Sequence, residues 1–390
     1  MHLVFVTSIV NHEEPMSGFE IANRVIVEAL RRAGHRVTVL GFAWPGRRPA
    51  DPDHTVTLGA VDVRTENASL PLKLLWLGKA MAAGLTFASV KLRAVPAERI
   101  REALAALEPF DGYVINGPQL AAAFPDLFHD RPALYVAHNV EHRSAAENAA
   151  AASGWLARLL YRREARLLRD IEARLCGRAA FVYVLAEEDR APLGVDGPGR
   201  SVVLPLVTRI TPPPPPAPRR ASCDAALIGT WTWQPNRIGL DWFLASVVPG
   251  LPADFRVEIA GQLPSGVRSD SPQVSFVGRV PDAGAFMRRA AVVPLSSRAG
   301  TGVQLKTLET FELGLPAVAT TRSLRGIDSL PGNCVVADEP REFAAAMVRQ
   351  TRMPPSDADG RSFYFKQRAA LDRALGVGLS RLAAGQRAAA

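Results

Sequence analysis

A glycine-rich segment followed by a lysine and a glutamate is the strongest sign of chemistry in this chain. Residues 296–302 read SSRAGTG, and the chain continues to Lys306 and Glu309. Glycines let backbone N–H groups approach an anion, and the first turn of a helix adds partial positive charge. We predict a helix over residues 302–314, with Lys306 about one turn inside it. Lys306 would then reach a diphosphate, and Glu309 would accept ribose hydroxyls. A glycine turn that caps a helix, with a surface Lys306–Glu309 pair, is an equally good interpretation.

A second candidate site follows a short apolar strand predicted over residues 133–137. The strand leads directly into the sequence HNVEH, which carries His138, Asn139, Glu141 and His142. A histidine in this position could orient a sugar hydroxyl or a phosphate, or act as an acid or base. Zinc binding is disfavoured because no third ligand is evident. A polar loop with a capping asparagine is the plainer alternative.

Three shorter segments could serve the same ligand. Gly18 lies in the loop before the first predicted helix and would let the chain pass close to a phosphate; the GxGxxG pattern of dinucleotide oxidoreductases is missing there. Residues 229–236 read GTWTWQPN, whose two tryptophans suit either a sugar or base platform or packing between domains. Arg279 follows a strand and could stack on a base or remain a turn residue.

An alternation of strands and helices must position these segments. We predict strands over residues 2–7, 36–42, 112–116, 133–137, 180–185, 202–206, 225–228, 256–260, 274–277, 291–295, 317–320 and 334–337. Between them we predict helices that include residues 96–108, 155–178, 237–248 and 340–350. Such units form parallel sheets, and ligands bind beyond the carboxyl ends of the strands. The fold class is therefore α/β, with two Rossmann-like, doubly wound domains in tandem and a cleft between them.

A proline run at residues 212–218 separates the two halves of the pattern. Proline lacks the amide donor that a helix or a central strand needs, so the run is a semi-rigid spacer. We expect an N-terminal domain over residues 1–210 and a linker over 211–222. The C-terminal domain then covers residues 223–355, and a helical segment over 356–390 packs back on the N-terminal domain.

The composition is that of a soluble globular protein: 48% of the 390 residues are hydrophobic and 22% are charged. The net charge of +8 permits a nucleic acid, an anionic membrane or a phosphate-rich ligand. We find no signal peptide and no uncharged apolar stretch of about 18 residues, so we expect a cytoplasmic chain without a spanning helix. Cys176, Cys223 and Cys334 are too few and too scattered for a disulfide framework or a zinc site.

Taken in order, the motifs resemble those of GT-B fold glycosyltransferases, similar to family 4 and nearest its exopolysaccharide-type members. The resemblance spans most of the chain and rests on residues 17–18 with 34–40 (GHRVTVL), 138–142 (HNVEH), 229–236, 277–282 (VGRVPD) and 300–320. It implies a hexosyl transfer from a nucleotide-diphosphate donor such as a UDP-sugar to a saccharide acceptor, expected to be lipid-linked. It implies retention of stereochemistry, surface or exopolysaccharide synthesis, and no cofactor or obligatory metal.

The same resemblance assigns roles to single residues. Glu309 would hold the ribose, Lys306 and the turn at 300–302 would hold the diphosphate, and His138 would lie near the transferred sugar. His138 and Lys306 are the predicted catalytic residues. The predicted donor-binding residues are Gly18, Gly229, Thr230, Arg279, Arg298, Gly300, Thr301, Gly302, Lys306 and Glu309. The predicted acceptor-side residues are Asn139, Glu141 and His142.

Two departures from the family pattern leave alternatives open. Thr301 stands where the family often has a first glutamate, eight residues before Glu309, and Thr230 replaces a usual arginine. The lysine expected near residues 235–236 is also missing, so Lys306 would neutralise the diphosphate with help from Arg298, Arg279 or Arg237. An inverting enzyme of glucuronosyl type and a non-catalytic sugar-nucleotide-binding relative remain alternatives. A nucleic-acid-binding protein is disfavoured, because no recognition module is present.

Two basic segments could lie against anionic lipid. Residues 70–95 combine apolar residues, among them Leu74, Leu75, Trp76 and Leu77, with Lys73, Lys79, Lys91 and Arg93. The helix predicted over 155–178 carries seven arginines and three acidic residues. A solvated helix face over the core explains each segment equally simply. Since a lipid-linked acceptor favours a protein at the membrane, we expect peripheral attachment to the inner face of an anionic membrane.

Overall fold

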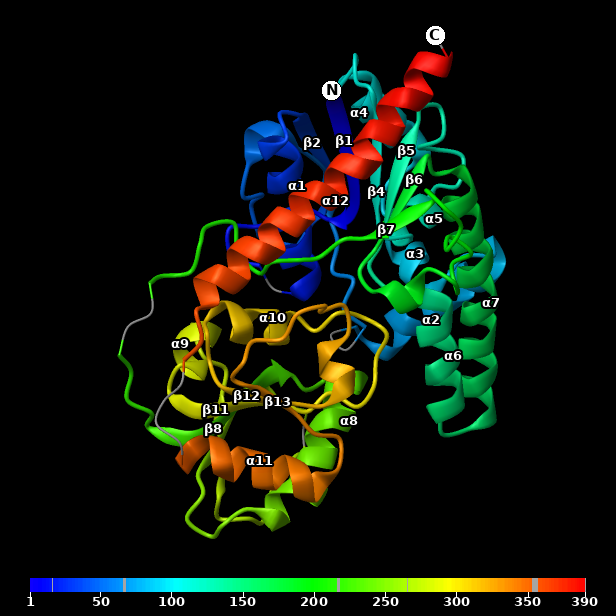
Figure 1. The fold of residues 1–390 in the computed structure, drawn as a ribbon. Helices are drawn as coiled ribbons and strands as arrows, with labels where there is room; N and C mark the ends of the chain where they lie inside the picture. Colours follow the sequence, from blue (N-terminus) through cyan, green and yellow to red (C-terminus); the bar gives the residue numbers. More distant parts are fainter. Residues whose placement is uncertain (16, 66–67, 216–217, 265, 353–356, 390) are drawn as a thin grey trace. The chain divides into compact units, whose positions relative to one another are not determined.

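The computed structural model describes every residue except 16, 66–67, 216–217, 265, 353–356 and 390. Its contacts divide the chain into two units, Met1–Pro205 with Ala370–Ala390, and Leu206–Ala369. Each unit is a parallel sheet with helices (Figure 1). The predicted α/β class with two Rossmann-like domains is therefore confirmed.

The first unit contains a seven-stranded parallel sheet in the order β3-β2-β1-β4-β5-β6-β7. Its strands are β1 (His2–Ile9), β2 (Arg36–Ala43), β3 (Thr55–Ala60), β4 (Gly112–Asn116), β5 (Ala133–Ala137), β6 (Phe181–Val184) and β7 (Ser201–Val203). The strand order reverses between β1 and β4, so the carboxyl ends of these two strands mark the switch point where a ligand is expected.

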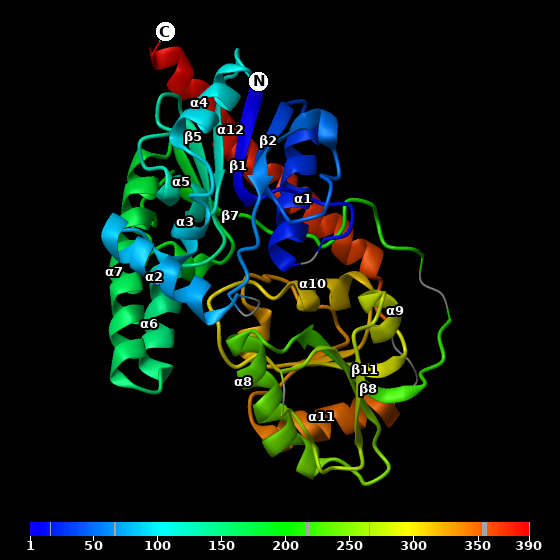
Figure 2. The same ribbon diagram turned by 180° about the vertical axis from the view of Figure 1, so that it is seen from behind.

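The helices of this unit follow the strands. They are α1 (Gly18–Arg32), α2 (Leu70–Ala83), α3 (Phe87–Lys91), α4 (Ala97–Ala105), α5 (Gln119–Ala123), α6 (Glu141–Ala151) and α7 (Trp155–Arg178), with short 3₁₀ turns at Pro52–His54 and Glu187–Asp189. The predicted boundaries of β4, β5 and α7 are confirmed, whereas β3, α2, α3, α5 and α6 were not predicted. Helices α6 and α7 lie side by side (Figures 1 and 2).

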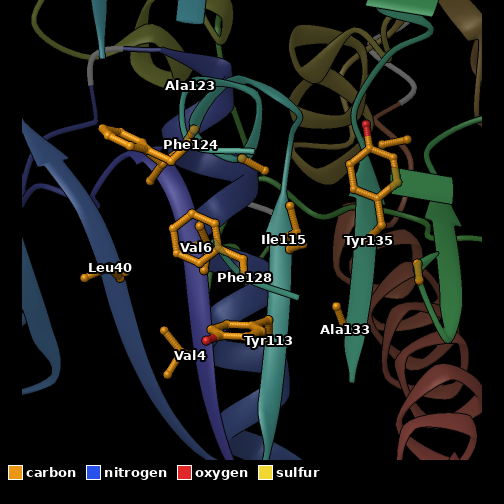
Figure 3. Close-up of a cluster of buried hydrophobic side chains, with 14 of the residues drawn as sticks. Val4, Val6, Leu40, Tyr113, Ile115, Ala123, Phe124, Phe128, Ala133 and Tyr135 are labelled. Atoms are coloured by element: carbon orange, nitrogen blue, oxygen red, sulfur yellow. The ribbon is translucent and has the colours of Figure 1, made fainter. Parts of the chain in front are cut away.

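Every residue of β4 and β5 is buried, as expected for central parallel strands with both faces covered. Figure 3 shows Val6 of β1 beside Ile115 of β4, with the ring of Phe128 next to them. Tyr113 packs edge to face against Phe128, at 5.7 Å between ring centroids. This packed core holds the carboxyl ends of the strands in fixed positions.

The second unit has a six-stranded sheet in the order β10-β9-β8-β11-β12-β13. Its strands are β8 (Cys223–Thr230), β9 (Val257–Gln262), β10 (Val274–Gly278), β11 (Ala290–Leu295), β12 (Ala317–Ala319) and β13 (Cys334–Val336). Its helices are α8 (Gln234–Trp242), which continues as a π-turn (Phe243–Val247) and a 3₁₀ turn (Val248–Gly250), α9 (Ala283–Met287), α10 (Leu305–Glu312) and α11 (Pro340–Arg352), with a 3₁₀ turn at Thr321–Leu324. The switch point lies between β8 and β11.

The last helix, α12 (Gly360–Ala389), begins in the second unit, and its residues from Ala370 onward belong to the first. Tyr183 of β6 donates a hydrogen bond to the Leu375 carbonyl, 2.7 Å away, inside the first unit. Residues 206–210, which we assigned to the N-terminal domain, belong to the second unit, because Thr208 and Arg209 bind a carboxylate of α10. The other predicted domain limits stay predictions, and residues 216–217 of the linker and 353–356 lie outside the described residues.

Among the residues that the structure describes, no helix combines the length and the apolar character needed to cross a bilayer.

Candidate functional site

The switch point of the second sheet brings the loops after β8 and β11 together. Close backbone approach requires glycine here: a Cβ on Gly239 would lie 2.5 Å from the Ser296 carbonyl oxygen. Gly261 has φ +118°, and a Cβ there would lie 1.9 Å from the Gly229 carbonyl oxygen. Gly300 has φ +98°, a backbone conformation that favours glycine, and it lies against Pro235. The predicted segments at 229–236 and 296–302 are thus parts of one surface.

Helix α10 begins later than predicted, at Leu305 rather than Gly302. Gly300 is in the left-handed region, and glycines are poor helix formers, so residues 300–303 continue the loop. Gln304 is the N-cap residue and forms no side-chain capping hydrogen bond. Lys306 therefore lies in the first turn of α10, beside amides that have no partner within the helix. Its charge and the partial positive charge of the helix end act at the same place.

Lys306 is held by Trp231, from the turn after β8, and by Asn236, in the first turn of α8. Its Nζ lies 3.4 Å from Asn236 Oδ1 and 5.4 Å from the centroid of the Trp231 ring. Trp231 is buried, and its Nε1 donates to the Ala260 carbonyl at 2.8 Å. Burial lowers the pKa of Lys306 to about 8, since desolvation disfavours the cation. No carboxylate among the described residues pairs with Lys306, so a cation in this environment favours an anionic ligand.

Glu309 lies one turn along the same helix, in a different environment. Its Oε1 is 3.7 Å from an amino group of Arg209. Arg209 also lies 3.3 Å from the buried carboxylate of Glu312, which accepts hydrogen bonds from the backbone N–H and the hydroxyl of Thr208. Burial raises the pKa of Glu309, and it raises that of Glu312 to about 7. Glu309 is partly exposed and retains lone pairs for hydroxyl donors.

The predicted arginines have other contacts in this structure. Arg298 lies over the Trp242 ring, at 4.8 Å, and donates to the Asp338 carbonyl at 3.0 Å. Arg279 donates to Gln262 at 2.8 Å, and Arg237 pairs with Asp241 at 2.7 Å. Arg279 and Arg298 are exposed. Of the cations considered from the sequence, Lys306 is the one placed directly at the start of α10.

Thr230, Thr301 and Gly302 complete the predicted donor side. Thr230 ends β8 and is exposed, Thr301 is buried, and Gly302 is partly exposed. Of the two tryptophans in this loop, Trp233 is 48% exposed, so its ring remains accessible to a ligand. The buried ring of Trp231 instead packs against the ammonium group of Lys306.

In the first unit, His138 follows the carboxyl end of β5 as predicted. Its Nε2 lies 2.8 Å from Oδ1 of Asn116, the last residue of β4, and its ring is 4.8 Å from that of Phe19 between centroids. Burial lowers the pKa of His138 to about 4, so the imidazole is neutral at physiological pH. Gly18, the first residue of α1, is exposed beside Phe19.

The HNVEH segment is divided between a loop and the start of α6. His142 Nδ1 lies 2.6 Å from a carboxylate oxygen of Glu172 on α7, and the backbone N–H groups of Glu141 and His142 also donate to this carboxylate. His142 therefore fastens α6 to α7. Burial, together with the nearby Glu172 charge, raises the pKa of Glu141 to about 7, although hydrogen bonds from Asn139 and Gln119 oppose the shift.

No group of three or more His, Cys, Asp or Glu side chains in the described part of the chain is arranged to hold a metal ion. The sequence reasoning missed Asn23, Asn116 and Arg209 as parts of these sites, and it named Asn236 only as the end of the segment 229–236. Asn116 ends a strand at its carboxyl end, so the rule that found His138 could have found it too. Arg209 precedes the proline run, and nothing in its sequence context indicates that it contacts α10.

Comparisons with known proteins show what the chain is similar to. Residues 224–352 match the family described as Glycosyl transferases group 1. This match includes Lys306, Glu309 and the loops around them. The predicted resemblance to GT-B glycosyltransferases is confirmed by this match and by the fold.

Solved glycosyltransferase structures share the fold over nearly the whole chain. Sucrose-phosphate synthase from Thermosynechococcus elongatus has 17% identity and a TM-score of 0.66, with 100% of both chains covered. HepE from Anabaena, in complex with UDP, has 14% identity and a TM-score of 0.58, covering 97% of this chain and 100% of its own. WaaG, a glycosyltransferase involved in lipopolysaccharide biosynthesis, has 17% identity and a TM-score of 0.55, with 95% of both chains covered. No curated protein matches the chain in sequence.

Proposed function

We propose that the protein is a hexosyltransferase that moves a sugar from a nucleoside-diphosphate donor to a saccharide acceptor. The position of Lys306 carries the proposal: a desolvated cation lies in the first turn of α10, against Trp231 and Asn236, at the switch point of the second sheet. A leaving diphosphate develops negative charge as the glycosidic bond breaks. A helix N-terminus and a lysine can stabilise that charge where water is scarce.

The remaining donor contacts follow from the same surface. The turn at residues 300–302 offers backbone amides to the diphosphate, and Glu309 accepts hydrogen bonds from the ribose hydroxyls. Thr230 is exposed, and the exposed Arg279 and Arg298 would reach phosphate or base by exchanging their contacts with Gln262 and Asp338. We propose UDP as the nucleotide, since the similar HepE structure holds UDP. The donor needs no metal in this proposal, because cationic and amide groups of the chain face the diphosphate.

Residues of the first unit would act on the sugars. His138 accepts a hydrogen bond from a hydroxyl of the transferred sugar, and Gly18 lets the α1 loop approach the donor. Asn139, Glu141 and His142 are the proposed acceptor-side residues. His142 is buried and bound to Glu172, so it would act by positioning the start of α6, whereas Glu141, with its pKa near 7, can exchange a proton at physiological pH. We propose retention of stereochemistry from the family resemblance.

Two alternatives are separated from this proposal by two experiments in sequence. An inverting transferase would give the opposite anomer, and a non-catalytic relative would bind the donor without turnover. A thermal-shift screen against UDP-, GDP- and ADP-sugars identifies the donor. A product assay then follows release of the nucleoside diphosphate and, by NMR, the anomeric configuration. Binding without release of UDP over many hours would favour the non-catalytic relative, and the absence of binding to any sugar nucleotide would contradict the proposal.

We further propose a lipid-linked acceptor, surface or exopolysaccharide synthesis, and peripheral binding to anionic membrane. The similar WaaG acts in lipopolysaccharide biosynthesis. Helix α2 carries apolar side chains that are strongly exposed, namely Leu70 (69%), Leu74 (59%), Leu75 (52%) and Met81 (53%). Exposed apolar groups beside lysines suit a lipid interface.

One of the predicted basic residues cannot take part in that surface. Lys91 is buried and donates to the Val63 carbonyl at 2.8 Å, whereas Arg93 is exposed, although it donates to the Ala123 carbonyl at 2.8 Å. Lys73 and Lys79 remain on α2. Trp76 is half-buried against Lys91 rather than exposed.

Helix α7 supplies a second basic surface next to α2. Arg163 of α7 donates to the Ala80 carbonyl at the end of α2, at 2.8 Å. The first turns of α7 expose Trp155 (76%) and Leu156 (54%). The exposed arginines of this helix, each contributing about 1 kcal/mol near anionic lipid, add to the attraction.

Vesicle flotation tests the membrane proposal. The protein should float with vesicles that contain anionic lipid at low salt and remain in solution with neutral vesicles. A double variant, Leu74→Glu with Leu75→Glu, should lose flotation, whereas the matched control Leu330→Glu changes an exposed leucine of the second unit and should retain it. Equal recovery of the double variant and the wild type would contradict a role for α2.

A further inference from the structure

A buried chain of polar side chains leads from the core of the first unit to His138. It runs from Thr7 of β1 through Asn23 of α1 to Asn116 of β4, and ends at the imidazole. Thr7 and Asn23 are 0% exposed and Asn116 is 1% exposed, so water cannot substitute for any of these partners. The chain occupies the switch point between β1 and β4.

The direction of each hydrogen bond in this chain is determined by the groups present. A backbone carbonyl can only accept, so the Asn23 group that lies 3.3 Å from the Ile9 carbonyl must be the Nδ2 amide. The same Nδ2 donates to Thr7 Oγ1 at 3.1 Å, which leaves Asn23 Oδ1 as an acceptor. Asn116 Nδ2 donates to this oxygen at 2.7 Å.

The same reasoning then determines which nitrogen of the imidazole carries the proton. With its Nδ2 used as a donor, Asn116 presents its Oδ1, an acceptor, to His138 Nε2 at 2.8 Å. His138 must therefore carry its proton on Nε2. Among the described residues, Nδ1 of His138 has no hydrogen-bond partner, and the ring is partly exposed. The free lone pair on Nδ1 is available to a ligand.

The titratable groups on the surrounding elements are already engaged. Glu20 on α1 binds His12 at 2.9 Å and the Trp44 indole at 3.0 Å. On α6, Glu141 binds Gln119 and His142 binds Glu172. Burial is the cause of the lowered His138 pKa, and the neutral amide of Asn116 does not oppose it.

We propose that Asn116 and Asn23 are positioning residues that hold His138 in its neutral Nε2–H tautomer, with Nδ1 as a hydrogen-bond acceptor for a hydroxyl of the transferred sugar. This inference rests on the proposed function for the identity of the ligand. It assigns His138 to sugar recognition and excludes it as a proton donor at neutral pH, because its one proton is committed to Asn116.

The tautomer can be measured without any substrate. In protein labelled with ¹⁵N-histidine, long-range ¹H–¹⁵N correlation spectra distinguish a protonated from an unprotonated ring nitrogen, and the His138→Gln variant assigns the signal. We expect an unprotonated Nδ1 and a protonated Nε2 from pH 8 down to about pH 5. A predominant Nδ1–H tautomer, or a mixture of the two tautomers, would overturn the inference whether or not the protein proves to be a transferase.

Two variants of Asn116 then test the function of the chain. Asn116→Leu removes the acceptor, so the tautomers should mix and kcat/KM should fall about tenfold, the equivalent of one hydrogen bond. Asn116→Asp places a carboxylate beside Nε2, which raises the pKa of His138 and fills the Nδ1 lone pair below that pKa. The acid limb of kcat/KM should therefore move to higher pH, with activity recovered above it.

Variants elsewhere separate positioning from a general loss of stability. Asn23→Leu frees the Asn116 amide to rotate and should also mix the tautomers, although Asn23 does not touch the imidazole. Thr38→Val is the matched control, since it removes a buried hydrogen bond, to His2 at 2.9 Å, on β2 of the same sheet. It should leave the His138 signal and the pH profile unchanged. Mixed tautomers with unchanged kcat/KM, or an unshifted acid limb in Asn116→Asp, would refute the positioning role.

Discussion

Replacing Lys306 by methionine should stabilise the free protein while it weakens donor binding. Burial lowers the pKa of Lys306 from 10.5 to about 8. Because the folded state then disfavours the charged lysine, the charge reduces folding stability fully below about pH 8, and this effect disappears as the pH rises to 10.5. The shift corresponds to about 3 kcal/mol. Lys306 is partly exposed, and screening by solvent reduces this figure to about 2 kcal/mol.

Methionine keeps the aliphatic stem of the lysine and removes the charge. At pH 7 the Lys306→Met variant should gain about 2 kcal/mol in free energy of unfolding, equivalent to about 5 °C in the melting temperature of the second unit. Its affinity for UDP should fall about tenfold to a hundredfold, because a hydrogen bond to a charged group contributes about 1.5–3 kcal/mol. Gain of stability together with loss of binding is the expected signature of a charge held for a ligand.

The pH dependence gives the prediction its control. UDP binding to the wild type should weaken above about pH 8, by up to about tenfold per pH unit, because the neutral amine cannot pair with phosphate. Lys306→Arg keeps its charge at every accessible pH, so its binding should not show this decline. Chemical unfolding and titration calorimetry at pH 7, 8.5 and 10 provide both quantities. A Lys306→Met variant that is less stable than the wild type, or one that binds UDP equally well, would refute the reasoning.

Three further predictions concern other parts of the fold. Glu309→Gln should weaken UDP binding about tenfold. Removing the 2′-hydroxyl of UDP should then cost this variant little further affinity, because the partner of that hydroxyl is already gone. If the losses of affinity from the protein change and the ligand change are additive, the ribose lies elsewhere. Gly261→Ala should destabilise the protein by more than about 3 kcal/mol in urea unfolding, because the new Cβ clashes with the Gly229 carbonyl. Gly266 also has a positive φ but lies in open space, so Gly266→Ala should lose only about 1 kcal/mol in free energy of unfolding. Tyr183→Phe should lower the free energy of unfolding by about 1 kcal/mol and increase proteolysis of residues 370–390, and unchanged protection of this segment would contradict a stabilising role for the bond to Leu375.

The elements that could be predicted from sequence are those whose pattern is set by burial alone. Strands β4 and β5 are short apolar runs buried at every residue, and α7 is a long periodic helix, so their limits follow from local sequence. The start of α10 could not be predicted in this way. The backbone at Gly300 adopts a left-handed conformation against Pro235, and this tertiary contact delays the helix to Leu305.

For the candidate sites, the sequence indicated which strands are followed by functional residues. It did not indicate which side chains form hydrogen bonds with those residues. His138 and Lys306 both follow strands, as expected for ligand sites in parallel sheets. Their partners are Asn116, at the end of β4, and Asn236, in the first turn of α8. Both lie far away in sequence, so only the folded chain brings them together. The role of Lys91 was misjudged for the same reason, because its burial beneath Trp76 depends on the packing of α2 and α3.

The most direct test of the donor site is a crystal structure of the protein with UDP. The β-phosphate should lie at the first turn of α10, with an oxygen about 2.8 Å from Lys306 Nζ, and the ribose hydroxyls should donate to Glu309. A diphosphate bound elsewhere on the chain, with Lys306 still resting against Asn236, would contradict the account.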